Sequence, residues 1–188
     1  MGADINARDD QGKTPLFVAA SEGQAEITKL LVDSGADLYL GLTTIVGHKP
    51  DGRTPVMMAA SSGKTKCVEI LINAGCNPDT RFVAGDTLLM NAVNKNKYTV
   101  AKRLISLGAD VNAQQRPCGY SNAAGYTPLI YAVRKSTPKI VELLLNEGAD
   151  PNYQLLSDPP MYVHEFNAGK KAENIDELLR SAGANIEG

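Results

Sequence analysis

The sequence predicts an all-α solenoid, in which short antiparallel helix pairs stack side by side. Three observations support this fold class: a Gly-Ala-Asp signature recurs along the chain, a Thr-Pro-Leu signature recurs in step with it, and apolar residues at helical spacing follow. A short helix pair has an apolar face that it cannot bury alone. Recurrence of the unit therefore implies that neighbouring units stack and share one core.

The unit is clearest between residues 125 and 152. Thr127 can cap a helix that begins at Pro128, because its hydroxyl can accept from a free backbone N–H and proline has no N–H to leave unpaired. A second helix follows, with apolar residues at i, i+3 and i+4 spacing from Ile140. Gly148 stands where a left-handed residue would end it. Two antiparallel helices are expected here.

Both signatures recur in register. The glycine of the first, or of a close variant, is Gly2, Gly35, Gly75, Gly108, Gly148 and Gly183, with gaps of 33, 40, 33, 40 and 35 residues. The threonine of the second is Thr14, Thr54, Thr87 and Thr127. These paired motifs resemble the ankyrin repeat family across essentially the whole chain. The resemblance implies stacked helix pairs joined by β-hairpin-like finger loops.

We expect residues 1–188 to form a single ankyrin-repeat domain. Its units are approximately 1–34, 35–74, 75–107, 108–147 and 148–188. In the last unit a proline-containing stretch replaces the first-helix start, and Arg180 stands where earlier units have apolar residues, so residues 153–188 are predicted to be a C-terminal cap. Because the first residues match the end of a repeat, the chain is expected to be a fragment of a longer array.

Two finger loops, at residues 38–50 and 114–125, are each longer than their neighbours by seven residues. The first is rich in β-branched residues and bounded by glycines, which favours an extended hairpin. Both additions enter at the same place in alternate units, so we expect them to carry partner specificity. The alternative is that a two-unit block of 73 residues was duplicated, and that the fingers have no function of their own.

The chain departs from the family at several positions. The histidine that the family places after Thr-Pro-Leu is replaced by Phe17, Met57, Met90 and Ile130, and apolar packing is expected to replace its hydrogen bonds. Asn96 replaces glycine between two helices and can adopt a left-handed conformation, whereas a different turn is expected at Ser136. Arg103 replaces an apolar residue, and its guanidinium is expected to lie in water.

Composition limits the classes of function. The net charge of −2 gives no overall field for nucleic acid or an anionic membrane, and no apolar run approaches the roughly 18 residues that span a bilayer. Three cysteines lack the close spacing of zinc or redox sites, which fits a reducing, intracellular location, cytoplasmic or nuclear. Cys67 and Cys76 are predicted core residues, and Cys118 is the one candidate for a reactive thiol.

No catalytic arrangement is recognisable in the sequence. The two histidines, His48 and His164, lie far apart, no nucleophile has a nearby base, and no glycine-rich phosphate loop follows a strand. The chain is therefore predicted not to be an enzyme, and to need no metal or cofactor.

The resemblance implies a protein-interaction module that binds its partner on a concave surface of fingers and first helices. The predicted partner-binding residues are Arg53, Arg81, Phe82, Val83, Lys95, Arg116, Tyr120, Tyr126, Arg134 and Lys135. Phe82 and Val83 are predicted to form an exposed apolar pair at a finger tip. The expected partner is a protein or peptide segment with apolar anchors and acidic residues.

Other functions remain open at this point. The basic C-terminal half of the concave surface could bind nucleic acid, with a steep dependence on salt, although the net charge weighs against it. An aromatic cage could read a methylated lysine, but such cages favour tryptophan and the chain has none. Asn112 resembles the residue that asparaginyl hydroxylases modify in ankyrin repeats. The oligomeric state is open, and the uncapped first repeat could associate edge to edge.

Overall fold

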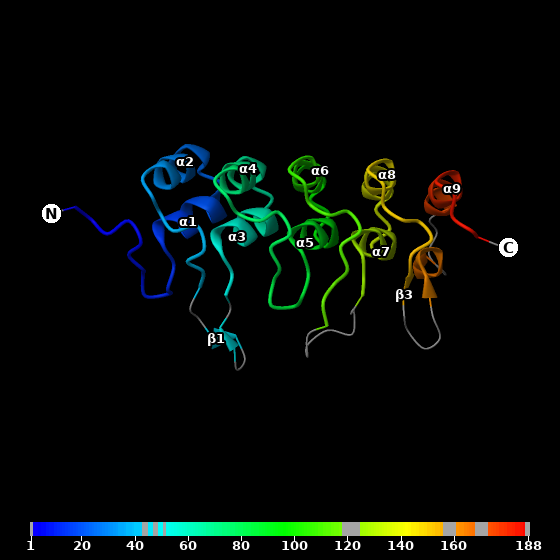
Figure 1. The fold of residues 1–188 in the computed structure, drawn as a ribbon, viewed down its shortest axis with the longest axis horizontal. Helices are drawn as coiled ribbons and strands as arrows, with labels where there is room; N and C mark the ends of the chain where they lie inside the picture. The colour runs from blue at the N-terminus through cyan, green and yellow to red at the C-terminus, as the bar shows by residue number, and fades with distance from the viewer. Residues whose placement is uncertain are drawn as a thin grey trace.

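A computed structural model describes residues 2–42, 45–46, 49–50, 52–117, 125–155, 161–167 and 173–186. Their helices form two layers (Figure 1). The outer layer holds α2 (Ala25–Asp33), α4 (Thr65–Asn73), α6 (Tyr98–Ser106), α8 (Pro138–Asn146) and α9 (Glu173–Ser181). The inner layer holds α1 (Pro15–Glu22), α3 (Pro55–Ser62), α5 (Leu88–Asn94), α7 (Pro128–Arg134) and the 3-10 helix η1 (Val163–Asn167). The chain is an all-α solenoid, as predicted.

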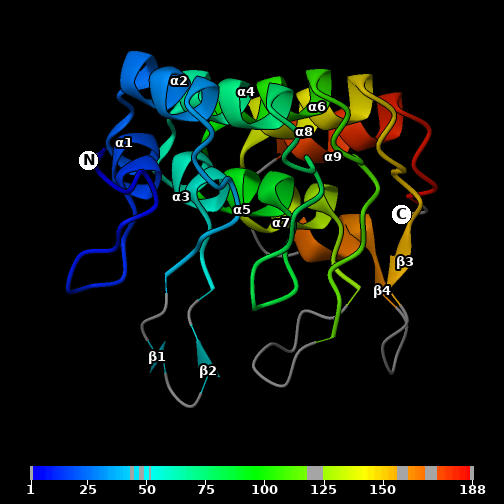
Figure 2. The ribbon, with the colours of Figure 1, turned by 60° about the vertical axis from the view of Figure 1, so that its left-hand side comes forward.

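The loops between units project from the inner layer to one side of the stack (Figure 2). In the first long finger, β1 (Ile45–Val46) pairs antiparallel with β2 (Lys49–Pro50), which confirms the predicted hairpin. After α8, β3 (Gln154–Leu155) pairs with β4 (Met161–Tyr162). Residues 118–124 of the second long finger lie outside the described residues.

The four fingers that precede a pair of α-helices share one base of two backbone hydrogen bonds. In the short fingers, Asp9 donates to Lys13 at 3.0 Å and Gly12 to Asp9 at 2.8 Å, and Phe82 donates to Asp86 at 2.9 Å and Gly85 to Phe82 at 2.8 Å. In the long ones, Leu42 donates to Arg53 at 2.9 Å and Gly52 to Leu42 at 3.2 Å, and Gln115 donates to Tyr126 at 2.8 Å and Gly125 to Gln115 at 2.9 Å. The seven additional residues of each long finger are therefore inserted beyond this shared base and leave its two hydrogen bonds intact.

Each of the four inner α-helices begins after a threonine in extended conformation. The Thr14, Thr87 and Thr127 hydroxyls accept hydrogen bonds from backbone N–H groups three residues later, at 3.2, 3.2 and 3.4 Å. The family's histidine position is buried in all four units, at Phe17, Met57, Met90 and Ile130. Apolar packing is only part of the replacement, however, because the Met57 and Met90 sulfurs each accept a hydrogen bond from the threonine N–H at 3.4 Å. A thioether is a weak acceptor, which the sequence-based expectation overlooked.

Equivalent leucines from successive outer helices form the centre of the core. Leu71, Leu104, Leu144 and Leu179 are fully buried, and Cys67 and Cys76 are buried beside them, which confirms their predicted place. Burial raises the pKa of the Cys76 thiol to about 11, because the thiolate would lose its hydration. A thiol with this pKa is nearly all protonated at neutral pH and is a poor nucleophile.

The turns at Asn96 and Ser136 have the same geometry. Their φ angles are 53° and 51°, so both residues are left-handed, and the expectation of a different turn at Ser136 was wrong. Asn96 donates to Val93 and Ser136 to Val133, each at 2.9 Å. The shared backbone hydrogen bonds impose the left-handed conformation on serine, which costs more there than on asparagine or glycine.

Arg103 also differs from expectation. Its guanidinium pairs with Glu69, which joins α6 to α4 of the preceding unit, and the side chain is 38% exposed. A half-buried guanidinium is costly to leave unpaired, and the stacking of units places a carboxylate within its reach. The sequence did not reveal this pair because its members are 34 residues apart.

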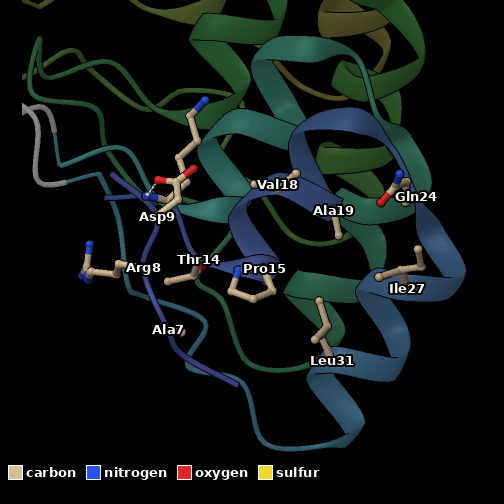
Figure 3. A pocket seen from close by; sticks show the side chains of 11 residues that line it. Ala7, Arg8, Asp9, Thr14, Pro15, Val18, Ala19, Gln24, Ile27 and Leu31 are labelled. Carbon is tan, nitrogen blue, oxygen red and sulfur yellow. Dashed lines mark hydrogen bonds between the residues drawn. The ribbon is translucent and has the colours of Figure 1, made fainter. Parts of the chain in front are cut away.

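The outward face of the first unit carries an apolar hollow. About 470 Å³ in volume, it is lined by side chains that include Val18, Ile27 and Leu31 (Figure 3). Ile27 is 47% exposed, whereas Cys67, Val100 and Ile140, which occupy the same repeat position, are at most 1% exposed. This edge therefore lacks the cover that each later unit receives from the unit before it.

We expect this edge to open before the centre of the stack does. Backbone amides in residues 14–31 should exchange hydrogen faster than those in residues 87–105, because fewer buried contacts oppose their local opening. Hydrogen exchange followed by mass spectrometry would test this. Slower exchange in residues 14–31 would contradict it, and would mean that the hollow is covered in solution.

Candidate functional site: the inner-helix and finger surface

We define the binding surface by the inner helices and the fingers beside them, which lie on one side of the stack (Figure 2). Among the predicted partner-binding residues, Val83, Lys95, Arg116, Arg134 and Lys135 are exposed, and Arg53, Arg81, Phe82 and Tyr126 are half-buried. Tyr120 lies outside the described residues. The surface thus combines exposed cations with partly covered aromatic rings.

Exposed cations gather at the ends of two inner helices. Lys95 and Lys135 occupy the residues that end α5 and α7, and Arg134 precedes Lys135. A helix carries partial negative charge at its C-terminus, so cations are favourable there. The exposed charges of Lys95 and Lys135 suit a partner that brings carboxylates.

The predicted apolar pair at the tip of the short finger is only half exposed. Val83 is 49% exposed, but Phe82 is half-buried and packs against the core. The reason is the tight finger turn, in which Phe82 bonds with both Asp86 and Gly85 through its backbone. Val83 is therefore the apolar contact that this finger offers, and the prediction of an exposed Phe82 was wrong.

Two predicted arginines already have contacts within the fold. Arg81 donates from Nη1 to the carbonyl oxygens of Gly85 at 2.8 Å and Gln114 at 2.9 Å. Arg53 points its Nη1 at the Met58 sulfur, 3.6 Å away. Their place in partner binding remains a prediction, and these contacts would constrain it.

An aromatic cluster lies between α7 and η1. Tyr126 meets Tyr131 and Phe166 edge to face, with ring centroids 5.7 and 5.4 Å apart. The Arg134 guanidinium lies over the Tyr126 ring, 5.0 Å from its centroid. A cation of the protein itself thus occupies the ring face that a ligand cation would use. Sequence reasoning missed Tyr131 and Phe166. The cluster forms only where the fourth unit meets the divergent last unit, to which Phe166 belongs.

Tyr131 also joins α7 to the short finger before it. Its hydroxyl donates to the Asp86 carboxylate at 2.7 Å. Burial raises the pKa of Asp86, although the hydrogen bond from Tyr131 and the charge of Arg81 oppose the shift. The pKa of Tyr131 is also raised, mainly by burial and then by its hydrogen bond to Asp86. Both shifts arise because ionisation would place further negative charge in a poorly hydrated site.

This pair predicts a loss of stability at alkaline pH. Tyr131 keeps its proton in the folded chain above its ordinary pKa of about 10, whereas the unfolded chain releases it there. The folded state then binds more protons than the unfolded one, so stability falls as pH rises above about 10. In Tyr131→Phe this part of the fall should disappear.

Urea unfolding at pH 8 and pH 10.5 would measure the effect, with Tyr98→Phe as control on the exposed side of α6. The Tyr131→Phe variant should be less stable than the parent at pH 8, by about 1–2 kcal/mol, because Asp86 loses its donor. If the stability of Tyr131→Phe and of Tyr98→Phe changed equally between the two pH values, the assignment would be contradicted.

Asn112 belongs to a row of polar side chains that join the loops of successive units. Its side-chain oxygen accepts from the Asp150 N–H at 2.9 Å, and its nitrogen donates to the Gly148 carbonyl at 3.0 Å. Asn6, Asp79 and Asn152 accept in the same way from the following unit. Hydroxylation of Asn112 stays a prediction, and an enzyme would have to open these hydrogen bonds to reach the residue.

The described residues offer no other site with obvious chemistry. Within this part of the chain, no three His, Cys, Asp or Glu residues are grouped as metal ligands. None of the helices described is long and apolar enough to cross a bilayer.

Comparison with known families gives matches along most of the chain. A profile described as "Ankyrin repeats (3 copies)" matches residues 40–115 and 85–154. Another, described as "Ankyrin repeats (many copies)", matches residues 1–32. Together the two matches of the first profile span more than half of the chain.

Curated relatives match over about one repeat. A putative ankyrin repeat protein of fowlpox virus, FPV219, is 46% identical over 37 residues, which are 20% of this chain and 8% of the relative. Protein phosphatase 1 regulatory subunit 27 of human and of mouse is 50% identical over 36 residues, which are 19% of this chain and 23% of the relative. The chain therefore matches less than a quarter of the length of these relatives.

Proposed function

Because the chain belongs to the ankyrin repeat family, a family of protein-interaction modules, we propose that it binds another protein through its inner helices and fingers, without catalysis. We also propose that residues 1–188 act as one domain, and that the protein works in the cytoplasm or nucleus. Buried free cysteines at 67 and 76 support a reducing location.

One observation carries the proposed surface: the exposed cations Lys95 and Lys135 end α5 and α7, two helices of the inner layer from which the fingers project (Figure 2). Such a surface suits a partner segment with acidic residues, and Val83 offers it an apolar contact. One relative's name describes a regulatory subunit of a phosphatase, which is in line with a protein partner. The short match transfers no particular partner to this chain.

Affinity capture from a cell lysate, followed by mass spectrometry, would identify the partner. The decisive comparison uses the double variant Lys95→Glu/Lys135→Glu and a matched control, Lys66→Glu/Lys102→Glu, which changes the same charge on exposed positions of the outer helices α4 and α6. We expect the first variant to bind at least about tenfold more weakly and the control to bind normally.

Equal binding by both variants would refute the proposed surface. Capture that nuclease treatment abolishes, with an affinity that falls steeply with salt, would instead support the nucleic-acid alternative.

A further inference from the structure

We infer that Arg8 and Arg81 are positioning residues that hold the bases of the two long fingers against the short fingers before them. The inference rests on the proposed function, in which the fingers are partner-binding loops. It concerns how those loops are held in the free protein, and it can be tested without a partner.

The first bridge joins the first two fingers. Arg8 Nη1 donates to the carbonyl oxygen of Gly12, at 2.9 Å, within its own finger. The same nitrogen donates to the carbonyl oxygen of Gly41, at 2.8 Å, at the base of the first long finger. In Figure 3 the Arg8 side chain extends away from α1. Its polar end is therefore directed to the loops and not to the core.

The second bridge repeats the first in the third and fourth fingers. Arg81 Nη1 donates to Gly85, four residues later, at 2.8 Å and to Gln114, 33 residues later, at 2.9 Å. Arg8 has the same two separations, 4 and 33 residues. Two further bonds strengthen this contact: Gln115 Nε2 donates to Ala84 at 2.8 Å and the Arg116 N–H to Gly85 at 3.3 Å.

The close approach of these loops is visible at Gly85. A Cβ atom added there would lie 2.2 Å from the Arg116 carbonyl oxygen, so a residue with a side chain would push the two fingers apart. Gly85 also has a φ of 85°, which favours glycine for a second reason.

Arginine suits this task because one guanidinium nitrogen carries two N–H groups, which can point to two carbonyl oxygens at once. In both bridges the residue after the acceptor begins the base of a long finger: Leu42 follows Gly41, and Gln115 follows Gln114. Each arginine thus anchors the strand from which its long finger extends. The seven additional residues start within a few positions of this anchor.

Hydrogen exchange measured by NMR on the free protein tests the inference. Arg8→Met should speed exchange at the Leu42 and Gly52 amides at least about fivefold, because the base of the long finger loses the hydrogen bond from Arg8 to Gly41 that ties it to the short finger. Arg81→Met should do the same at Gln115 and Gly125. Each variant should leave the other finger unchanged, so the two variants control each other.

Arg8→Lys and Arg81→Lys keep a charged donor and should restore most of the protection against exchange. Lys66→Met, at an exposed position of α4, controls for the loss of one positive charge. Changes below twofold at all four amides would overturn the inference. So would an equal rise at core amides such as those of Val100 and Leu104, since it would show general destabilisation. Selective opening of each finger supports the bridges even if the captured partner proves to bind elsewhere, which keeps this test separate from that of the proposed function.

Discussion

Replacement of Leu104 by alanine is expected to lower the free energy of unfolding by about 2–5 kcal/mol. Leu104 is fully buried at the centre of the stack, between equivalent leucines of the neighbouring units. The substitution would remove apolar contacts and leave a cavity that two packed units cannot easily collapse. Because each unit is stabilised through its neighbours, the loss should weaken the stack on both sides of α6.

Leu31 provides a matched control, because it occupies the same repeat position in the first unit but is only half-buried. Leu31→Ala should cost clearly less than Leu104→Ala, and Leu30→Ala, at a residue that is 65% exposed, should cost about 0.5 kcal/mol or less. Urea unfolding followed by circular dichroism would measure all three. Similar losses for Leu31→Ala and Leu104→Ala would show that the first unit is covered in solution.

Shortening both long fingers to the length of their neighbours is expected to weaken partner binding at least tenfold, about 1.4 kcal/mol. Deletion of residues 45–51 and 118–124 removes seven from each finger. Both hydrogen bonds of each base remain, because they involve residues 42, 52 and 53 in one finger and 115, 125 and 126 in the other. The shortened loops would match the spacing of the short finger at residues 82–86, so the fold should persist.

The affinity for the captured partner would be measured by calorimetry for the double deletion and for each single deletion. A circular dichroism spectrum and an unfolding midpoint close to those of the parent would establish that the deletions are folded. Unchanged affinity in a folded double deletion would favour the alternative that the two fingers were duplicated together without a function.

The helix pairs could be predicted from the sequence because their signals are local. Threonine, proline and the apolar spacing that follows them lie within one turn or two, and the structure places Thr127 and Gly148 at the predicted ends of helices. The fully buried positions follow from the same register. Ser136 shows the limit of the method, since its left-handed turn is imposed by backbone hydrogen bonds and not by its own preference.

The contacts between units could not be predicted in this way. Arg103 with Glu69, Tyr131 with Asp86 and Arg81 with Gln114 join residues 33 to 45 positions apart. Each depends on which side chains the stacking of units brings together, and a half-buried polar group finds a partner that a single unit does not contain. Exposure at the candidate site was predicted correctly for Lys95 and Val83 but not for Phe82, whose side chain packs against the core.

The arginine bridges also limit how such an array could lengthen by duplication. Arg8 and Arg81 are 73 residues apart, and each donates to the next unit along the chain. In that next unit the position of the arginine is occupied by Gly41 or Gln114, so the long-finger units carry no bridging arginine. If a unit with a short finger were copied alone, the first arginine would face a second short finger. If a unit with a long finger were copied alone, the second long finger would lack a bridging arginine. A copy of two adjacent units keeps every donor beside its acceptor. An engineered extension of this protein should therefore proceed in blocks of two.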